Sequence, residues 1–121
     1  MINSKNLFVV MLFLITSCIQ PEETVSSLDG NQSPVIREII IDKQSIATGE
    51  FTTISVDAVD PDGGELNYSW HAFIGDIIGS GSIIRYTASY CCVGVNTIRL
   101  TVSDNNGANV SRTIDIVITE N

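Results

Sequence analysis

From Pro34 to Thr119, short apolar runs alternate with polar residues, and Gly, Asp, Asn and Pro separate the runs. Within most runs an apolar side chain recurs at every second position, which is the period of a β-strand with one buried face. No apolar period of 3.6 residues occurs in this part of the chain, so no helix is predicted. The predicted strands are residues 35–42, 52–59, 66–73, 76–78, 82–88, 95–103 and 109–119.

Seven short strands joined by tight turns predict an all-β, two-sheet antiparallel sandwich in which each sheet has one buried face and one wet face. Trp70 is predicted to be a core aromatic rather than a surface for ligand stacking, because its neighbours at every second position are apolar. The side chains expected to face the core are Ile54, Val56, Ala58, Leu66, Tyr68, Trp70, Ala72, Ile98, Leu100, Val102, Ile114, Ile116 and Ile118.

Three motifs carry a family resemblance: "DPDGGELNYSW" at 60–70, "IIRYTA" at 83–88 and "GVNTIRLTVSDNNG" at 94–107. They resemble the PKD and related immunoglobulin-like modules of bacterial envelope proteins. The resemblance implies a seven-stranded immunoglobulin-like β-sandwich over residues 34–119. The chain departs from the family pattern after Trp70, where "HAFIGD" follows, and at Asn96, where the family often has the tyrosine that makes a corner hydrogen bond.

The first residues are typical of a secretory signal, with Lys5 before the apolar run "LFVVMLFLI" at 7–15. The segment Ile15-Thr16-Ser17-Cys18 resembles the lipobox of bacterial lipoproteins. That resemblance implies a signal peptide over residues 1–17, cleavage before Cys18, and fatty acylation (palmitate and similar chains) of Cys18. The alternative is an ordinary signal peptide with an incidental cysteine. Several acyl chains are enough for stable membrane anchoring.

Residues 18–33 combine the lipidated Cys18 with a stretch rich in Pro, Ser, Gly and acidic residues, which indicates a flexible tether. The pair Glu22-Glu23 resembles export signals of surface lipoproteins in Bacteroidetes-like bacteria, although plain linker charge explains it equally well. We expect a lipid-anchored protein of the bacterial cell envelope, in the outer membrane, on its periplasmic face or at the cell surface.

The net charge of −8 and the scattered basic residues exclude a nucleic-acid partner, since neutralising phosphates takes clustered Lys and Arg. The sequence contains no nucleophile elbow, phosphate-binding loop or metal-binding histidine pair. The single histidine, His71, follows Trp70 directly and is expected on the opposite, solvated face. We therefore expect no enzyme activity and no cofactor apart from the lipid.

Once Cys18 carries lipid, only the adjacent pair Cys91 and Cys92 remains in an oxidising compartment. Three interpretations stay open for this pair: a vicinal disulfide, bonds to another chain or a small thiol, or two thiols that simply pack in a loop. A vicinal bond would close a small ring and crosslink little, so its use would be to stiffen and present the loop. Zinc binding is not expected, because four spaced ligands are missing.

Antiparallel tracing places the turns at 60–65, 79–81 and 104–107 at the end where the tether begins, and Cys91 and Cys92 at the opposite end with the 43–49 and 74–75 turns. Asp60, Asp62, Asp104 and Asn106 would then gather and offer oxygen ligands to calcium. The alternative, which we favour, is that Asp60 and Asp104 cap their own turns.

Taken together, the sequence predicts a membrane-anchored lipoprotein with one immunoglobulin-like module that binds protein or carbohydrate, as in adhesion. The runner-up is an accessory or structural subunit of an envelope complex for export or polysaccharide handling. A redox role for Cys91 and Cys92 is a distant third. Nothing in the chain identifies the partner.

Overall fold

The structure is a computed structural model and describes residues 30–121. The predicted signal peptide at 1–17, Cys18 and the Glu22-Glu23 pair lie outside the described residues. Asn31–Asn121 form one compact unit. In this unit the only helix described is the single turn η2 (Tyr90–Cys92), and no described helix has the length and apolar character needed to cross a membrane.

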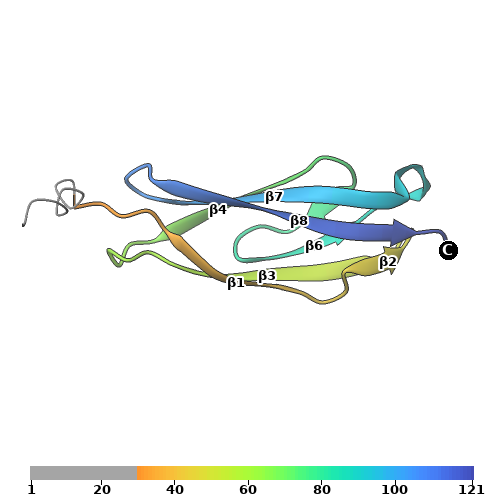
Figure 1. Cartoon of the computed structure of the whole chain (residues 1–121), viewed down its shortest axis with the longest axis horizontal. Coiled ribbons are helices and arrows are strands. Elements are labelled where there is room, and N and C mark those ends of the chain that lie inside the picture. The colour runs from red at the N-terminus through yellow and green to blue at the C-terminus, as the bar shows by residue number, and fades with distance from the viewer. Residues whose placement is uncertain (1–29) are drawn as a thin grey trace, which may run out of the picture. The chain divides into compact units, whose positions relative to one another are not determined.

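Two four-stranded sheets lie face to face (Figure 1). One sheet has the strand order β1-β3-β6-β5 and the other the order β2-β8-β7-β4. The strands are β1 (Val35–Ile41), β2 (Ser45–Ala47), β3 (Phe51–Val59), β4 (Leu66–Ala72), β5 (Asp76–Ile78), β6 (Ile83–Thr87), β7 (Gly94–Asp104) and β8 (Asn109–Thr119).

The predicted all-β sandwich is confirmed, but the predicted count of seven strands is wrong, since the described residues form eight. The additional strand is β2, within the 43–49 segment that was expected to be a turn. β2 pairs with β8 in parallel, with Ile46 opposite Ile118. The chain thus leaves the first sheet after β1 and joins the second one, and Ile46 becomes part of the core.

The core lies between the sheets and has two adjoining clusters of buried side chains. Trp70 packs against both clusters and donates a hydrogen bond from Nε1 to the carbonyl oxygen of Gly81 at 2.8 Å. It is partly buried, so the prediction of a core aromatic is confirmed for its packing. The largest fully buried side chain is Tyr86 of β6.

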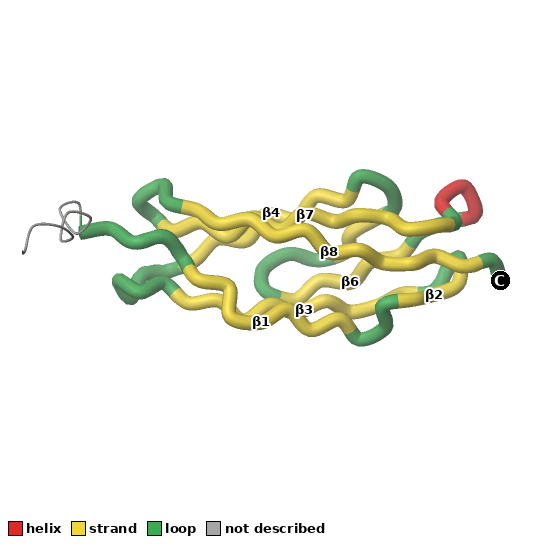
Figure 2. Tube along the Cα trace, in the orientation of Figure 1, coloured by secondary structure: helices red, strands yellow, loops and turns green. Residues whose placement is uncertain are grey.

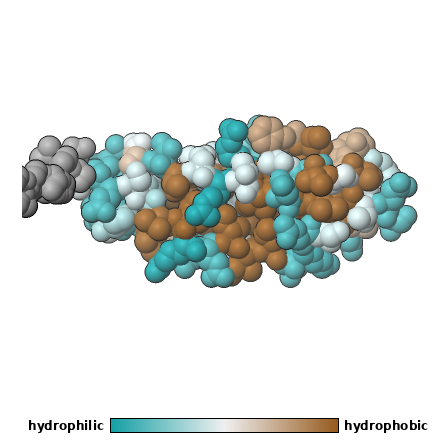
Figure 3. Space-filling model, viewed as in Figure 1, coloured by the Kyte–Doolittle hydropathy of each residue, from teal (hydrophilic) through white to brown (hydrophobic). Residues whose placement is uncertain are grey.

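The two ends of the sandwich differ in what they carry. The near end holds Asn31 together with the turns 60–65 and 104–108, and the far end holds the C-terminus, β2 and η2, the red helix in Figure 2. In Figure 3 apolar surface lies along the middle of the domain and toward the far end, and hydrophilic residues cover the near end and the tip of the far end.

The predicted position of the 79–81 turn at the near end is wrong. The backbone N–H of Val56 donates to the carbonyl oxygen of Ser82, and Trp70 reaches Gly81, so this turn lies about halfway along the sandwich. The cause is the length of β5 and β6, which span three and five residues while β3 spans nine. The predicted far-end position of the cysteine pair agrees with the structure, where η2 directly precedes β7.

Candidate functional site

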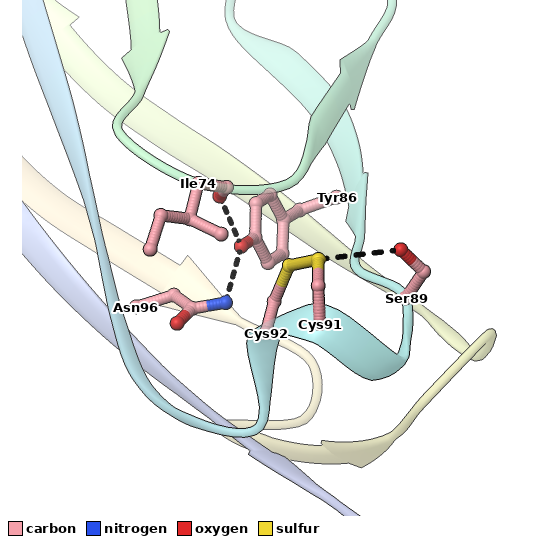
Figure 4. The surroundings of a disulfide bond; sticks show 6 residues. All are labelled: Ile74, Tyr86, Ser89, Cys91, Cys92 and Asn96. Carbon is pink, nitrogen blue, oxygen red and sulfur yellow. Dashed lines mark hydrogen bonds between the residues drawn. A yellow bond between two sulfur atoms is a disulfide. The ribbon is translucent and has the colours of Figure 1, made fainter.

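The connection between β6 and β7 at the far end holds the cysteine pair. In the structure Cys91 and Cys92 form a disulfide with each other, which is the first of the three interpretations left open by the sequence (Figure 4). The N–H of Cys92 donates to the carbonyl oxygen of Ser89 at 2.9 Å, closing the turn of η2. Cys92 is buried in the core, whereas Cys91 is exposed. The two residues are adjacent, so the disulfide closes a small ring within η2 and crosslinks no other part of the chain.

A buried polar relay lies beside the disulfide (Figure 4). The hydroxyl of Tyr86 donates to the carbonyl oxygen of Ile74 at 2.6 Å, and Asn96 Nδ2 donates to the same hydroxyl at 3.0 Å. The relay joins β6, the β4–β5 turn and the start of β7. Burial raises the pKa of Tyr86 above its ordinary value of 10.0; the hydrogen bond from Asn96 opposes this change and Asp76 adds to it.

The relay also requires a glycine in the β4–β5 turn. Gly75 has a φ of +94°, and a Cβ atom there would overlap the Tyr86 hydroxyl and come within 2.8 Å of the carbonyl oxygen of Thr87. Only glycine fits this conformation and this space. Asn96, which stands where the family pattern often has a tyrosine, supplies a hydrogen bond of its own from a buried position.

Sequence reasoning missed Tyr86 and Asn96 as a pair, although a signal was present. Asn96 lies two residues before Ile98, so the alternation of β7 points it into the core. A buried amide needs a partner. Tyr86 alternates with Ile84 in the same way, so the same argument places both polar groups on inward faces of the two sheets.

A small pocket lies next to the disulfide loop. Its volume is about 160 Å³, and Thr48, Gly49, Ser89 and Tyr90 line it. The N–H of Gly49 donates to the carbonyl oxygen of Ala88 at 2.9 Å, which fastens the β2–β3 turn to the β6–β7 connection. Thr48 is only 7% exposed, and its Oγ1 has no hydrogen-bond partner among residues 30–121. Leaving such a hydroxyl unpaired costs about 1–3 kcal/mol.

Apolar side chains are exposed around the same end of the domain. Tyr90 is 76% exposed, the highest value among the large hydrophobic residues described. Val93 and Val95 follow it along the chain, and Phe73 and Ile74 are exposed in the β4–β5 turn. We call these five residues, Phe73, Ile74, Tyr90, Val93 and Val95, the far-end apolar group. Their exposure makes this end of the domain a candidate contact surface.

His71 is exposed on the outer face of β4, as predicted from the alternation. Its ring meets Phe73 edge to face at a centroid distance of 4.9 Å, and the guanidinium of Arg99 lies 5.4 Å from the centre of the Phe73 ring. These contacts are packing between neighbours on one sheet face. His71 has no hydrogen-bonded acid or nucleophile among the described contacts that would give it a catalytic arrangement.

At the near end the hydrogen bonds confirm that the aspartates cap their own turns. Asp60 accepts from the N–H groups of Asp62 and Gly64, at 2.9 and 3.1 Å. Asp104 Oδ1 accepts from the N–H groups of Asn106 and Ala108, both at 2.9 Å. Asp104 Oδ2 is buried and has no partner in the described part of the chain.

The predicted calcium ligands are thus split between two turns, and the start of the domain runs across both. The N–H of Gln32 donates to Asp62 Oδ2, and Asn106 Nδ2 donates to Asn31 Oδ1. Residues 30–121 contain no group of three or more His, Cys, Asp or Glu side chains placed to hold a metal ion. Calcium binding by Asp60, Asp62, Asp104 and Asn106 stays a prediction, and the caps account for these residues without it.

Comparison with solved structures places the sandwich among known modules. The PKD1 domain of Vibrio anguillarum Epp is 28% identical, with a TM-score of 0.53, over 75% of this chain and 99% of that domain. The PKD domain of an M14-like peptidase from a Thermoplasmatales archaeon is 17% identical, with a TM-score of 0.61. The match covers 74% of this chain and 99% of that domain.

A third similar structure is a nucleoside hydrolase-related hypothetical protein from Saccharophagus degradans, described as associated with carbohydrate metabolism. It is 22% identical, with a TM-score of 0.56, and the match covers 75% of this chain but only 26% of that protein. A search of curated proteins finds no match. The sequence profile of the bacterial Ig domain family matches residues 31–117, which is most of the chain. The chain therefore belongs to the bacterial Ig domain family.

Proposed function

We propose that this protein is a lipid-anchored lipoprotein of the bacterial cell envelope whose Ig domain binds a protein or a carbohydrate through its far end, without catalysis. The observation that carries the proposal is the exposed side chain of Tyr90. It lies on a loop that the disulfide stiffens and that starts and ends next to the strands joined by the buried relay. Aromatic side chains on rigid supports contribute most to binding, because little conformational entropy is lost when they are covered.

The position of this loop supports the same proposal. The domain begins with Asn31 at the near end, where the turns are closed by their own hydrogen bonds. The far-end apolar group lies at the opposite end of the strands and has no cover within the described domain. A domain anchored on its N-terminal side would present this group away from the membrane. The similarity to PKD domains is consistent with a binding or adhesion module.

The anchor is tested by metabolic labelling with an alkyne analogue of palmitate. The full-length protein should incorporate the label and partition into the membrane fraction, and Cys18→Ala should lose both because it removes the only acylation site of the lipobox. Cys91→Ser serves as the matched control, since it removes a different cysteine and should keep the label. An unlabelled wild-type protein in a labelled cell would refute the anchor.

Binding is tested with a photo-crosslinking amino acid placed at Tyr90 in living cells. The same residue at Asn105, which is exposed at the near end, is the matched control. We expect adducts to envelope protein or glycan from position 90 and few or none from position 105. Equal adducts from both positions, or none from either, would contradict binding through the far end.

The alternative function is an accessory or structural subunit of an envelope complex for export or polysaccharide handling. It is favoured by β1, an edge strand with Val35 and Ile40 exposed, because edge strands accept a further strand from a partner. A stable stoichiometric membrane complex that crosslinks through Ile40 would support this function, whereas a glycan or foreign cell surface captured through Tyr90 would support adhesion.

A redox role for Cys91 and Cys92 makes a separate prediction. The full-length protein isolated from cells would then contain both forms, differing in mass by two hydrogens and interconverting readily with a mild dithiol. For a binding module we expect the oxidised form alone.

A further inference from the structure

We infer that the free edge of β4 pairs with the β4 edge of a second copy of this chain, so that two domains share one continuous sheet. The inference goes beyond the proposed far-end binding and concerns a different surface. It starts from the four edge strands that the two open sheets leave, which are β1 and β5 in one sheet and β2 and β4 in the other. An edge strand exposes N–H and C=O groups that can pair with another chain.

The four edges differ in how much regular strand they offer. β2 and β5 are three residues long each. β1 spans seven residues, but its register with β3 shifts between Ile36 and Glu38, and Arg37 and Glu38 carry charges. Short strands, irregular register and charge all hinder edge pairing. β4 also spans seven residues, its register with β7 is continuous from Leu66 to Ala72, and it contains no Asp, Glu, Lys or Arg.

The hydrogen bonds show which backbone groups of β4 face outward. The N–H of Phe73 donates to the carbonyl oxygen of Thr97 at 3.2 Å, next to the pair of Ala72 and Ile98. In an antiparallel ladder, residues that bond to the neighbouring strand alternate with residues whose N–H and C=O point the other way. The backbone groups that point away from β7 are therefore those of Leu66, Tyr68, Trp70 and Ala72. Outside the strand pairs, no hydrogen bond within residues 30–121 involves these groups.

The exposure of β4 agrees with an open edge. β7, the next strand in the sheet, buries Ile98, Leu100 and Val102 completely. No residue of β4 is fully buried, and even its inward-facing side chains are only partly covered. A further strand beside β4 would cover apolar surface as well as pair with the backbone.

The edge of β4 is complementary to its own reverse. Antiparallel pairing centred on Ser69 sets Leu66 opposite Ala72 of the second copy. It also sets Tyr68 opposite Trp70, so all four outward-facing residues pair at once. The contact is two-fold symmetric and uses up both edges, so it closes as a dimer and does not continue into a fibre.

The outer face of β4 fits the same register. Ser69 would meet Ser69 of the second copy, and Asn67 would meet His71, all exposed in the single domain. Like charges directly opposite each other destabilise strand pairs, and this register contains none.

A charge pair on each side of the axis favours a second copy over an unrelated strand. In this register Glu65, directly before β4, comes opposite Phe73 of the second copy. The guanidinium of Arg99 lies 5.4 Å from the centre of the Phe73 ring, and Arg99 forms no salt bridge within residues 30–121. Glu65 would thus approach an unpaired cation, and the symmetry repeats this pair. The pairs oppose the repulsion between two chains of net charge −8.

The contact is tested with single cysteines in the full-length protein in cells. Ser69→Cys should link two copies, because Cα atoms of such a non-hydrogen-bonded pair lie about 4.5 Å apart, within the roughly 4.4–6.8 Å of disulfides. Thr101→Cys is the matched control. Thr101 lies beside Ser69 on the same face but one strand further from the axis, so its Cα atoms would be roughly 14 Å apart. A non-reducing gel measures the product of twice the chain mass against the wild-type background.

The register has its own test. Asn67→Cys alone and His71→Cys alone should give no product above background, because four residues along a strand separate each position from its copy by about 13 Å. Two differently tagged chains, one with each substitution, should crosslink when they are expressed together.

Charge variants test the contact without cysteines, by sedimentation of the full-length protein in detergent. Ser69→Lys places like charges on the axis and should raise the dimer dissociation constant about tenfold or more. Thr53→Lys, at an exposed position on the outer face of β3, is the matched control and should not change it. Glu65→Arg and Arg99→Glu should each weaken the dimer, and the double variant should restore it.

Crosslinking of Ser69→Cys that does not exceed that of Thr101→Cys would overturn the inference. A disulfide-linked product of any other mass would also overturn it, because the edge would then belong to a different protein. Equal effects of Ser69→Lys and Thr53→Lys would refute the contact as well. None of these results touches the proposed far-end binding, which the crosslinker at position 90 tests separately.

Discussion

The near end and the far end of this sandwich use polar groups in opposite ways. At the near end, Asp60 and Asp104 accept two N–H groups each, and Asn31 and Gln32 bond to the turns around them. At the far end, the polar groups of the relay are buried, and the five side chains of the far-end apolar group are exposed. The turns at the near end are stabilised by hydrogen bonds within the domain. At the far end, a buried hydrogen-bonded relay lies beneath exposed apolar side chains.

This difference shows why the far end is the better candidate for recognition. Polar turns that satisfy their own hydrogen bonds gain little from a partner. An exposed apolar group on a rigid base gains from being covered, because burial removes apolar surface from water and costs little order. Five measurements test the contrast, taken from the largest expected effect to the smallest.

The largest effect is expected for Gly75→Ala at the far end. A Cβ atom at φ +94° is strained, and it overlaps Tyr86, so we expect a loss of about 3 kcal/mol in the free energy of unfolding. Urea denaturation measures this. The matched control is Gly107→Ala at the near end, which has φ +96° and open space around its Cβ position, and should lose about 1 kcal/mol from backbone strain alone. Equal losses in the two variants would show that the relay does not constrain the far end.

The next effect is expected for Tyr86→Phe, which leaves the carbonyl oxygen of Ile74 and the amide of Asn96 without their partner. We expect a loss of about 2 kcal/mol at neutral pH, measured by urea denaturation.

The same variant should change the alkaline limb of the stability curve. The pKa of Tyr86 is raised in the folded state, so the contribution of its neutral form is intact below the ordinary value of 10.0 and is lost as the pH rises through the raised pKa. The wild-type protein should therefore lose stability above pH 10 more steeply than Tyr86→Phe. Parallel curves would contradict a buried, neutral Tyr86.

A smaller effect is expected for Asp104→Ala at the near end. The variant loses two hydrogen bonds to backbone N–H groups, but it also removes a buried oxygen that has no partner. These changes oppose each other, and we expect a net loss of about 1 kcal/mol. Asn105→Ala, in the same turn, should change the stability by less than about 0.5 kcal/mol. A loss larger than that of Tyr86→Phe would reverse the contrast between the ends.

The smallest effect is expected from a calcium chelator. The turns of Asp60 and Asp104 are closed by their own hydrogen bonds, so the melting temperature of the full-length protein should be the same with and without chelator. A lower melting temperature in chelator, absent from a variant that lacks Asp62, would establish a calcium site at the near end.

Alternation along the chain was enough to predict the long strands, because β3, β4, β7 and β8 each bury one face. It was not enough for β2. Three residues carry too little pattern, and their pairing with β8 depends on tertiary contacts some seventy residues away along the chain. The predicted placement of the turns also assumed that all strands have equal length. Because β5 and β6 are short, the 79–81 turn does not reach the near end.

The candidate site was predictable only in part. The position of Cys91 and Cys92 at the far end followed from the order of the strands. The pocket did not, because Thr48 and Tyr90 come together only through the bond between Gly49 and Ala88, which links two turns that the sequence pattern treats separately. Alternation along β6 and β7 places Tyr86 and Asn96 on inward faces, but their pairing across the two sheets leaves no local signal in the sequence.

The short strand β2 has a mechanical consequence. It runs parallel to β8, so tension between Asn31 and the C-terminal end of β8 pulls the two strands past each other along their length. Their hydrogen bonds are then strained in shear and must break together, whereas an antiparallel hairpin opened from its free end parts one bond at a time. A module that joins an anchored chain to a partner on a moving surface would resist detachment through this three-residue strand.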